Sequence, residues 1–162
     1  MLQSFIIFIA ALSVFVLPFV IYGQTKKKKV KKLITALESF AQEQGCQISR
    51  HETWNHSAIG LDDAKKVLFV YRNLNENPVK QFIPLHDVSR CKVEEESRQV
   101  KHNGGMLKVV DGISLVFSFL DNKKAPIAFS LYNAESDGLS LNGISTLAER
   151  WSANVQSLRS KK

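Results

Sequence analysis

The chain has few of the residues that cross-link or punctuate a fold. Its 162 residues include two cysteines, four prolines and eight glycines. Two cysteines cannot form a disulfide framework, so we expect Cys46 and Cys91 to be reduced, with at least one of them inside a sheet. If the domain were exported, a single bridge would be possible, because the sequence leaves their Cα separation open.

The sequence also lacks a recognisable catalytic or cofactor motif. Gly104 and Gly105 are followed by neither the lysine nor the helix start of a phosphate-binding loop. The acidic runs 62–63 and 94–96 fit solvated turns better than general acid–base chemistry. No acid or thiolate stands at metal-ligand spacing from any of the four histidines, which are His51, His56, His86 and His102. We therefore predict a protein that is not an enzyme and that holds neither a metal nor a cofactor.

A third absence is charge near the beginning of the chain. No charged side chain occurs before Lys26, and residues 5–22 are entirely uncharged, with 13 of the 18 being Phe, Ile, Leu or Val. A helix of that length measures roughly 27 Å, close to the hydrocarbon thickness of a bilayer. Its apolar side chains favour insertion by roughly 4–8 kcal/mol. The pattern predicts a transmembrane anchor over residues 1–23.

A cleaved signal peptide and a buried core helix are the alternatives to this anchor. A signal peptide needs basic residues before its apolar run and small residues before the cut, whereas Met1–Ser4 carry no charge and 21–23 is a poor cleavage site. A core helix is rarely so long and so free of charge. We favour the uncleaved anchor. The remaining alternative is an exported lipocalin-like or enzymatic β domain released by cleavage.

A dense block of lysines follows the apolar run. By the positive-inside rule it places the rest of the chain in the cytoplasm, as a single-pass protein of the plasma (inner) membrane. Each lysine near an anionic leaflet contributes about 1 kcal/mol to attraction, so we expect contact with lipid headgroups. The residues expected to touch the membrane surface are Lys26, Lys27, Lys28, Lys29, Lys31 and Lys32.

These lysines also account for most of the net charge of +7. Residues 24–50 hold seven Lys/Arg against two Glu, a balance of +5, and residues 51–162 hold fifteen against thirteen acids, a balance of +2. The remainder of the chain is therefore nearly balanced. Because a membrane-flanking segment explains the basic excess, we predict no nucleic-acid partner.

Residues 24–45 have the period of a basic juxtamembrane amphipathic helix. Thr25 can cap its start, and Gly45 can supply a left-handed stop. We favour packing of its apolar stripe on the domain that follows; a dimerising or membrane-lying face is the alternative. The stripe consists of Val30, Leu33, Ile34, Leu37, Phe40 and Ala41.

Residues 46–162 have the pattern of one antiparallel β domain. Alternation is clearest at Ile113, Leu115 and Phe117, which indicates a half-buried strand. The polar segment 95–105 predicts a turn or mobile loop, and 73–78 predicts another turn. The expected strands are 46–54, 58–61, 67–72, 80–85, 88–94, 113–120 and 127–132.

The last segment returns to helical spacing. Apolar residues recur at helical intervals over residues 140–159, which predicts an amphipathic helix that covers one side of the sheet. We expect Ile144, Leu147 and Trp151 to form the core of this closing helix.

Six or seven short strands closed by one helix resemble the pleckstrin-homology-like (PH-like) family. The residues that carry the likeness are the segment 58–62, the strands 67–71, 113–120 and 127–132, and Trp151. In that family a tryptophan of the closing helix packs onto the open end of the barrel. The resemblance implies an antiparallel barrel or sandwich of α+β class.

The same resemblance implies a binding module. Its partners in that family are lipid headgroups, peptides or proteins, but the basic cluster of the lipid-binding members is sparse here, being limited to Arg50, His51, His56, Lys65 and Lys66. We therefore predict a membrane-anchored interaction protein with an unidentified protein partner. The alternative is an accessory structural subunit of a larger membrane complex.

Overall fold

The computed structural model describes residues 27–74, 77–102, 104–138, 141 and 143–160. The predicted anchor, 1–23, and Lys26 lie outside the described residues. Within the described residues, no helix combines the length and the apolar character needed to cross a bilayer.

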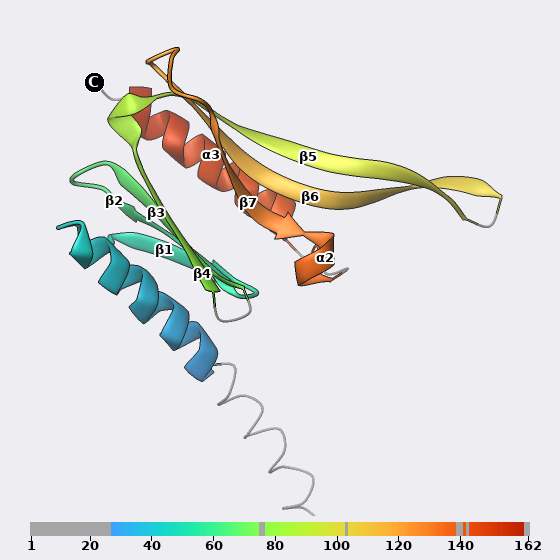
Figure 1. Ribbon diagram of the computed structural model, residues 1–162, viewed down its shortest axis with the longest axis horizontal. Coiled ribbons are helices and arrows are strands. Elements are labelled where there is room, and N and C mark those ends of the chain that lie inside the picture. The colour runs from blue at the N-terminus through green and yellow to red at the C-terminus, as the bar shows by residue number, and fades with distance from the viewer. Residues whose placement is uncertain (1–26, 75–76, 103, 139–140, 142, 161–162) are drawn as a thin grey trace, which may run out of the picture.

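The described chain is an α+β structure with seven strands in two antiparallel sheets (Figure 1). The first sheet has the order β1-β2-β3-β4, so each strand pairs with the next along the chain. A short 3₁₀ helix, η1 (Leu85–Asp87), leads from it to the second sheet. The strands of the first sheet are β1 (Arg50–Trp54), β2 (Ser57–Asp62), β3 (Val67–Leu74) and β4 (Asn77–Pro84).

The second sheet has the order β5-β6-β7. Its first two strands, β5 (Val88–His102) and β6 (Gly105–Phe119), are 15 residues long each, whereas β7 (Ile127–Asn133) has seven. Because β7 pairs only with residues 112–117 of β6, the outer part of the β5–β6 hairpin extends beyond the rest of the molecule (Figure 1). We call this part, residues 97–110, the arm.

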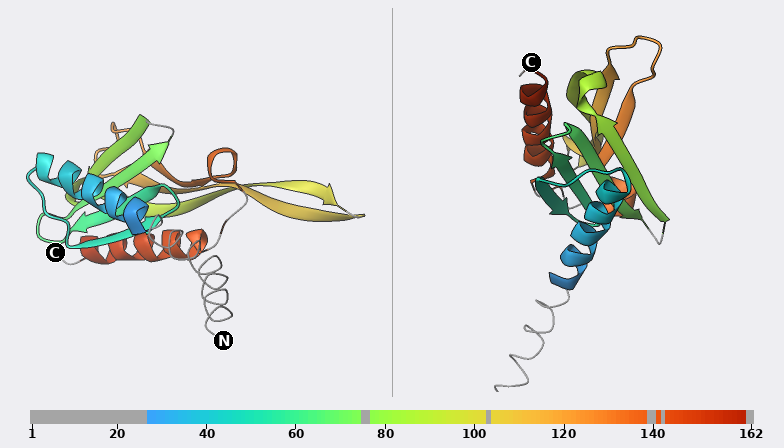
Figure 2. Two further views of the ribbon diagram at one scale, coloured as in Figure 1. Left: turned by 90° about the horizontal axis from the view of Figure 1, so that it is seen from below. Right: turned by 90° about the vertical axis from the view of Figure 1, so that its left-hand side faces the viewer.

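The main core lies between the two sheets and is closed by the C-terminal helix α3 (Ile144–Ser160), as the two views of Figure 2 show. Alternate residues of β3 and β6, such as Leu68 and Leu115, are fully buried in it. Trp54 joins the sheets, since its indole Nε1 donates to the Leu131 carbonyl oxygen at 2.7 Å. The predicted core residues of the closing helix, Ile144, Leu147 and Trp151, are all buried here.

A helix over residues 27–43 covers the opposite face of the first sheet. Most of the predicted apolar stripe is buried there, with Leu37 and Ala41 inaccessible. Gly45 has a φ of +67°, which is the left-handed stop expected after this helix. Val30 is 41% exposed, so the stripe does not extend to this first turn. The expected packing of the helix on the domain is confirmed.

Three local predictions were wrong. Residues 46–49 are not a strand, because Cys46 packs against the helix 27–43 and the Gln47 amide is held by Asp62 at 2.9 Å. Residues 73–74 and 77–78 are not part of a turn, since Asn73 pairs with Pro78 in the β3–β4 ladder; residues 75–76 lie outside the described residues. Residues 95–102 are not a loop, because they continue β5 and pair with β6, with a register shift between Glu96 and Ser97.

Two helical elements have no counterpart in the predictions, and η1 is the first of them. A single helical turn, α2 (Ala134–Asp137), follows β7 directly. Asn133 caps it by accepting a hydrogen bond from the Glu135 amide at 2.9 Å. The turn places Asp137 against the first sheet, where it contacts Arg72.

Candidate binding site: a basic pocket beside the N-terminal helix

The described lysines of the predicted membrane-contact cluster occupy the first turns of the helix 27–43 and are all exposed. Within the part of the chain that the structure describes, none of them forms an ion pair; the one ion pair of this helix joins Glu43, at its other end, to Lys80, 3.8 Å away. Their charge is therefore available to an external anion. The lysines concerned are Lys27, Lys28, Lys29, Lys31 and Lys32.

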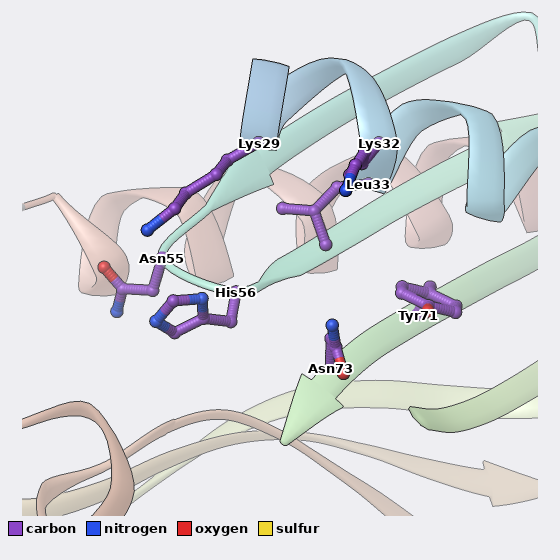
Figure 3. A pocket seen from close by; sticks show the side chains of 7 residues that line it. All are labelled: Lys29, Lys32, Leu33, Asn55, His56, Tyr71 and Asn73. Atoms are coloured by element: carbon purple, nitrogen blue, oxygen red, sulfur yellow. The ribbon is translucent and has the colours of Figure 1, made fainter. Parts of the chain in front are cut away.

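A pocket of about 310 Å³ lies between this basic turn of the helix and the first sheet. Figure 3 shows Lys29 extending from the helix toward Asn55, while His56 and Asn73 approach from the sheet side. Leu33 and Tyr71 supply its apolar surface, and Lys32 completes the lining. The three contributing parts are the helix, the β1–β2 turn and β3.

Local backbone geometry fixes the sheet side of the pocket. Trp54 pairs with Ser57, which leaves Asn55 and His56 as a two-residue hairpin turn. Asn55 has a φ of +43°, a conformation that asparagine tolerates better than most residues. The Asn73 amide donates to the His56 carbonyl oxygen at 2.9 Å and so ties this turn to β3.

The helix side of the pocket is fixed by packing. Leu33 is 7% exposed, and it belongs to the cluster that joins the helix to Phe69 and Ala58 of the sheet. Lys29, four positions before Leu33 and so one helical turn away, and Lys32, directly before it, are therefore carried to the pocket by a helix that is already anchored. The positions of these charges do not depend on a loop.

The chemistry of the lining favours an anion. Two ammonium groups, one imidazole and two carboxamides can all donate hydrogen bonds, and no lining residue is acidic. Lysine binds phosphate as a point charge, while neutral donors such as asparagine fix its orientation. The pocket is suited to a phosphate or carboxylate group, and it offers neither a nucleophile–base pair nor a thiolate.

Other sequence candidates lie elsewhere. Arg50 is bound to Asp63 at 2.6 Å, and the Lys65 ammonium donates to the Gly45 carbonyl oxygen, so neither lines the pocket. Of the basic residues expected near the first two strands, His56 alone contributes to it. The described residues contain no group of His, Cys, Asp and Glu side chains that could hold a metal ion.

Both cysteines are free and buried, in different clusters. Burial raises the pKa of the Cys91 thiol to about 11, although a hydrogen bond from Ser152 lowers it slightly. Burial also raises the pKa of Cys46. These thiols are structural, because only the thiolate is reactive and both sites disfavour it.

Three lining residues were missed by reasoning from the sequence. Asn55, Tyr71 and Asn73 come from a turn and a strand, and their contribution depends on how the helix docks across the sheet. A weak signal existed in the residues Trp-Asn-His-Ser at 54–57, since asparagine is favoured in tight hairpin turns.

Comparison of the chain with models of known protein families, with curated proteins and with solved structures gives no match.

Proposed function

We propose that the protein is a single-pass, membrane-anchored interaction protein. Residues 5–22 span the bilayer, and the basic turn at 27–32 binds anionic lipid headgroups at the cytoplasmic surface. The observation that carries this proposal is the cluster of exposed lysines without ion pairs, which directly follows an uncharged apolar run in the sequence. A free cationic surface at this place favours an anionic leaflet.

The pocket gives this attraction a defined geometry. One phosphate could receive charge from Lys29 and Lys32 and hydrogen bonds from Asn55 or Asn73. The mechanism is local concentration: a weakly binding domain held at the membrane meets membrane-bound partners at high effective concentration. No chemical step is required of the domain.

For residues 46–162 we propose a PH-like fold. The order of the two sheets, four strands followed by three, and the helix that closes the core support it. Trp151 is 4% exposed and donates its indole N–H to Glu52 of β1 at 2.9 Å, so the closing helix is tied to the first sheet. Fold likeness alone assigns no ligand.

Vesicle binding tests the lysine pocket directly. The full chain is reconstituted into phosphatidylcholine vesicles. A second vesicle population, which carries either no anionic lipid or one fifth phosphatidylserine, is then added, and bridging of the two populations is measured by flotation. We expect Lys29→Gln with Lys32→Gln to lower bridging to anionic vesicles roughly thirty-fold, because two lysines contribute about 2 kcal/mol.

A charge-matched control is Lys101→Gln with Lys123→Gln, two exposed lysines outside the pocket. It removes the same net charge and should leave bridging within about two-fold, because the attraction falls off within a Debye length of the surface. Equal loss in both double variants would mean that net charge matters and the pocket does not.

Topology is tested in intact cells with a protease added from outside. Protection of the C-terminal domain, together with resistance of the protein to extraction by alkaline carbonate, is the expected result. A mature N-terminus near Gln24, detected by mass spectrometry, would replace the anchor with a cleaved signal peptide.

The arm supports the second candidate, an accessory subunit of a membrane complex. Near its turn, Met106 and Leu107 are 65% and 53% exposed, although a strand that only completes a core would bury such residues. Co-purification in mild detergent, with the arm intact and shortened, distinguishes a subunit from a lone binder.

A further inference from the structure

A second cavity, of about 280 Å³, lies between the last strand of the first sheet and the last strand of the second. Val79 and Gln81 of β4 form one wall, and Ala128, Phe129 and Ser130 of β7 form the other. We call it the β4–β7 cleft. It is separate from the basic pocket and shares no residue with it.

The cleft exists because the sheets diverge at this edge. Val79 and Gln81 pair with Arg72 and Val70, which point into the core, so they occupy core-facing positions of β4. Nevertheless Val79 is 43% exposed, whereas Ile83, two core-facing positions further along, is 1% exposed. An apolar core-facing side chain is therefore left uncovered at the start of β4.

Two buried polar atoms at the cleft have no hydrogen-bond partner within the described residues: Arg72 Nε and Gln81 Oε1. Arg72 is 4% exposed, and its terminal nitrogens are occupied by Ser130, Ser136 and Asp137. Buried polar atoms are nearly always paired, because each unpaired one costs about 1–3 kcal/mol. One atom is a donor and the other an acceptor, so a carbonyl oxygen and an N–H of an extended chain could satisfy them.

The main chain beside these atoms is also unpaired. β4 has β3 on one side and no strand on the other among the residues that the structure describes. Pro78 and Pro84 lack an N–H, so an added strand could pair only with residues 79–83. The edge of β7 is less available, because the carbonyl oxygens of Ser130 and Leu131 already accept from Arg72 and Trp54.

We propose that the β4–β7 cleft binds an extended peptide segment of a partner protein, which adds to β4 as a strand. One carbonyl oxygen of this segment accepts a hydrogen bond from Arg72 Nε, and an N–H of another of its peptide groups donates one to Gln81 Oε1. A small apolar side chain of the segment covers Val79 and Phe129. Because Asp137 already neutralises Arg72, the segment is uncharged where it enters the cleft.

This inference goes beyond the headgroup-binding function and is independent of it, because the two sites share no residue. Main-chain pairing would supply affinity, and the cleft would select the side chain that enters it. The cavity has room for part of a chain and is smaller than typical pockets for small molecules. This size favours a short extended contact.

The probe is a phage-displayed library of random twelve-residue peptides, selected on the full chain in detergent micelles. The enriched peptide is synthesised, and its affinity is measured by fluorescence anisotropy. We expect an uncharged, partly apolar core sequence. Methylation of one backbone nitrogen in that core should weaken binding about ten-fold, because it removes the hydrogen bond to Gln81.

Two variants locate the binding. Val79→Asp should weaken peptide binding more than ten-fold. Val100 is a similarly exposed strand valine on the arm, and Val100→Asp should leave the affinity unchanged. Gln81→Leu removes the acceptor and should weaken binding several-fold while leaving the urea unfolding midpoint unchanged or higher. Unfolding curves of the three variants separate loss of binding from loss of fold.

Several outcomes would overturn the proposal. They are the absence of any enriched peptide, binding that survives both Val79→Asp and Gln81→Leu, or binding that Val100→Asp removes. A concentration-dependent dimer in sedimentation velocity that Val79→Asp abolishes would make a second copy of the chain the occupant, and would also overturn it. Lipid vesicle binding is unaffected in every one of these cases if the basic pocket acts as proposed.

Discussion

Arg72 and Asp137 form an ion pair inside the protein. Nη2 of Arg72 lies 2.5 Å from Oδ2 of Asp137, and the two side chains are only 5% and 2% exposed. Asp137 also accepts from the Asn133 amide at 2.9 Å, and Arg72 donates to the Ser130 carbonyl oxygen at 3.0 Å. The pair therefore joins β3 of the first sheet to the single turn α2 that follows β7.

Removing one member of this pair should be strongly destabilising. Asp137→Ala leaves a buried guanidinium without its anion, and we expect the free energy of unfolding to fall by about 3–5 kcal/mol. Urea denaturation of the full chain in micelles measures this change. Asp63→Ala, which breaks the exposed pair with Arg50, should cost about 1 kcal/mol or less. Similar losses in both variants would refute a special role for the buried pair.

Gly60 marks the closest approach of the helix 27–43 to the first sheet. A Cβ placed there would lie 2.8 Å from Leu37 Cδ2 and 3.0 Å from Ile48 Cγ2. We expect Gly60→Ala to lower the free energy of unfolding by about 1–3 kcal/mol through overpacking. Leu37→Ala should lower the free energy of unfolding less in the Gly60→Ala variant than in the wild-type chain, because it removes the clash.

Gly112 provides the matched control for that substitution. It also lies in a strand, but the nearest atom to an added Cβ is Glu96 Oε2 at 3.5 Å, an ordinary contact. Gly112→Ala should leave stability unchanged within about 0.5 kcal/mol or raise it slightly. If both alanines were equally tolerated, the helix would not be packed as closely as described.

Asp62 links stability to pH. Burial of its carboxylate raises the pKa, but backbone hydrogen bonds from Lys65, Gln47 and Ala64 outweigh burial and hold the pKa below its ordinary value of 3.8. A lowered pKa means that the carboxylate stabilises the fold above pH 3.8, and that this contribution is lost as the pH falls through the folded-state pKa.

Asp62→Asn tests this linkage. The amide keeps an acceptor for Ala64 and Lys65 but presents an NH₂ group to the Gln47 amide, so we expect a loss of about 1–3 kcal/mol at pH 7. The difference from wild type should shrink as unfolding is measured at successively lower pH below 4. A difference that is constant over this range would argue against an ionised Asp62 in the fold.

The thiol of Cys91 should resist alkylation in the folded protein. Because burial raises its pKa to about 11, roughly one molecule in a thousand carries the thiolate at pH 8. Treatment with iodoacetamide at pH 8, followed by mass spectrometry, should leave Cys91 unmodified in the native chain and fully modified in concentrated urea. Rapid native labelling would show that β5 opens readily.

Segments with one buried face could be predicted from the sequence. Ile113, Leu115 and Phe117 alternate because β6 buries one face there, and Ile144, Leu147 and Trp151 recur at helical spacing because α3 buries one stripe. Burial imposes the pattern in both elements, so the pattern predicts the element. The succession of strands along the chain and the closing helix followed from the same signals.

The segments that were mispredicted lack such a face. Residues 95–102 are exposed on both sides of a two-stranded hairpin, so no alternation is required of them. The basic pocket was predictable only in part for a related reason. Lys29 and Lys32 stood out by charge, but Asn55 and Asn73 join them only through the docking of a helix on a sheet.

The arm should be dispensable for folding. Two ion pairs join the arm to the residues at its base, Arg98 to Asp111 and Lys108 to Glu95; all four side chains are at least one third exposed, and such pairs contribute about 1 kcal/mol or less. Its apolar residues near the turn are exposed as well. Replacing residues 99–108 by Asn-Gly would join Arg98 to Val109, which are directly paired, through a favourable two-residue turn.

We expect the free energy of unfolding of the shortened protein to lie within about 1 kcal/mol of that of the full chain, since the described side chains that it loses are all exposed. Met106→Ser with Leu107→Ser keeps the arm and removes its exposed apolar surface, and it should have the same stability. If both variants fold normally but lose a protein that co-purifies with the full chain, the arm is a docking element. A loss of several kcal/mol in the shortened chain would instead make the arm part of the folding unit.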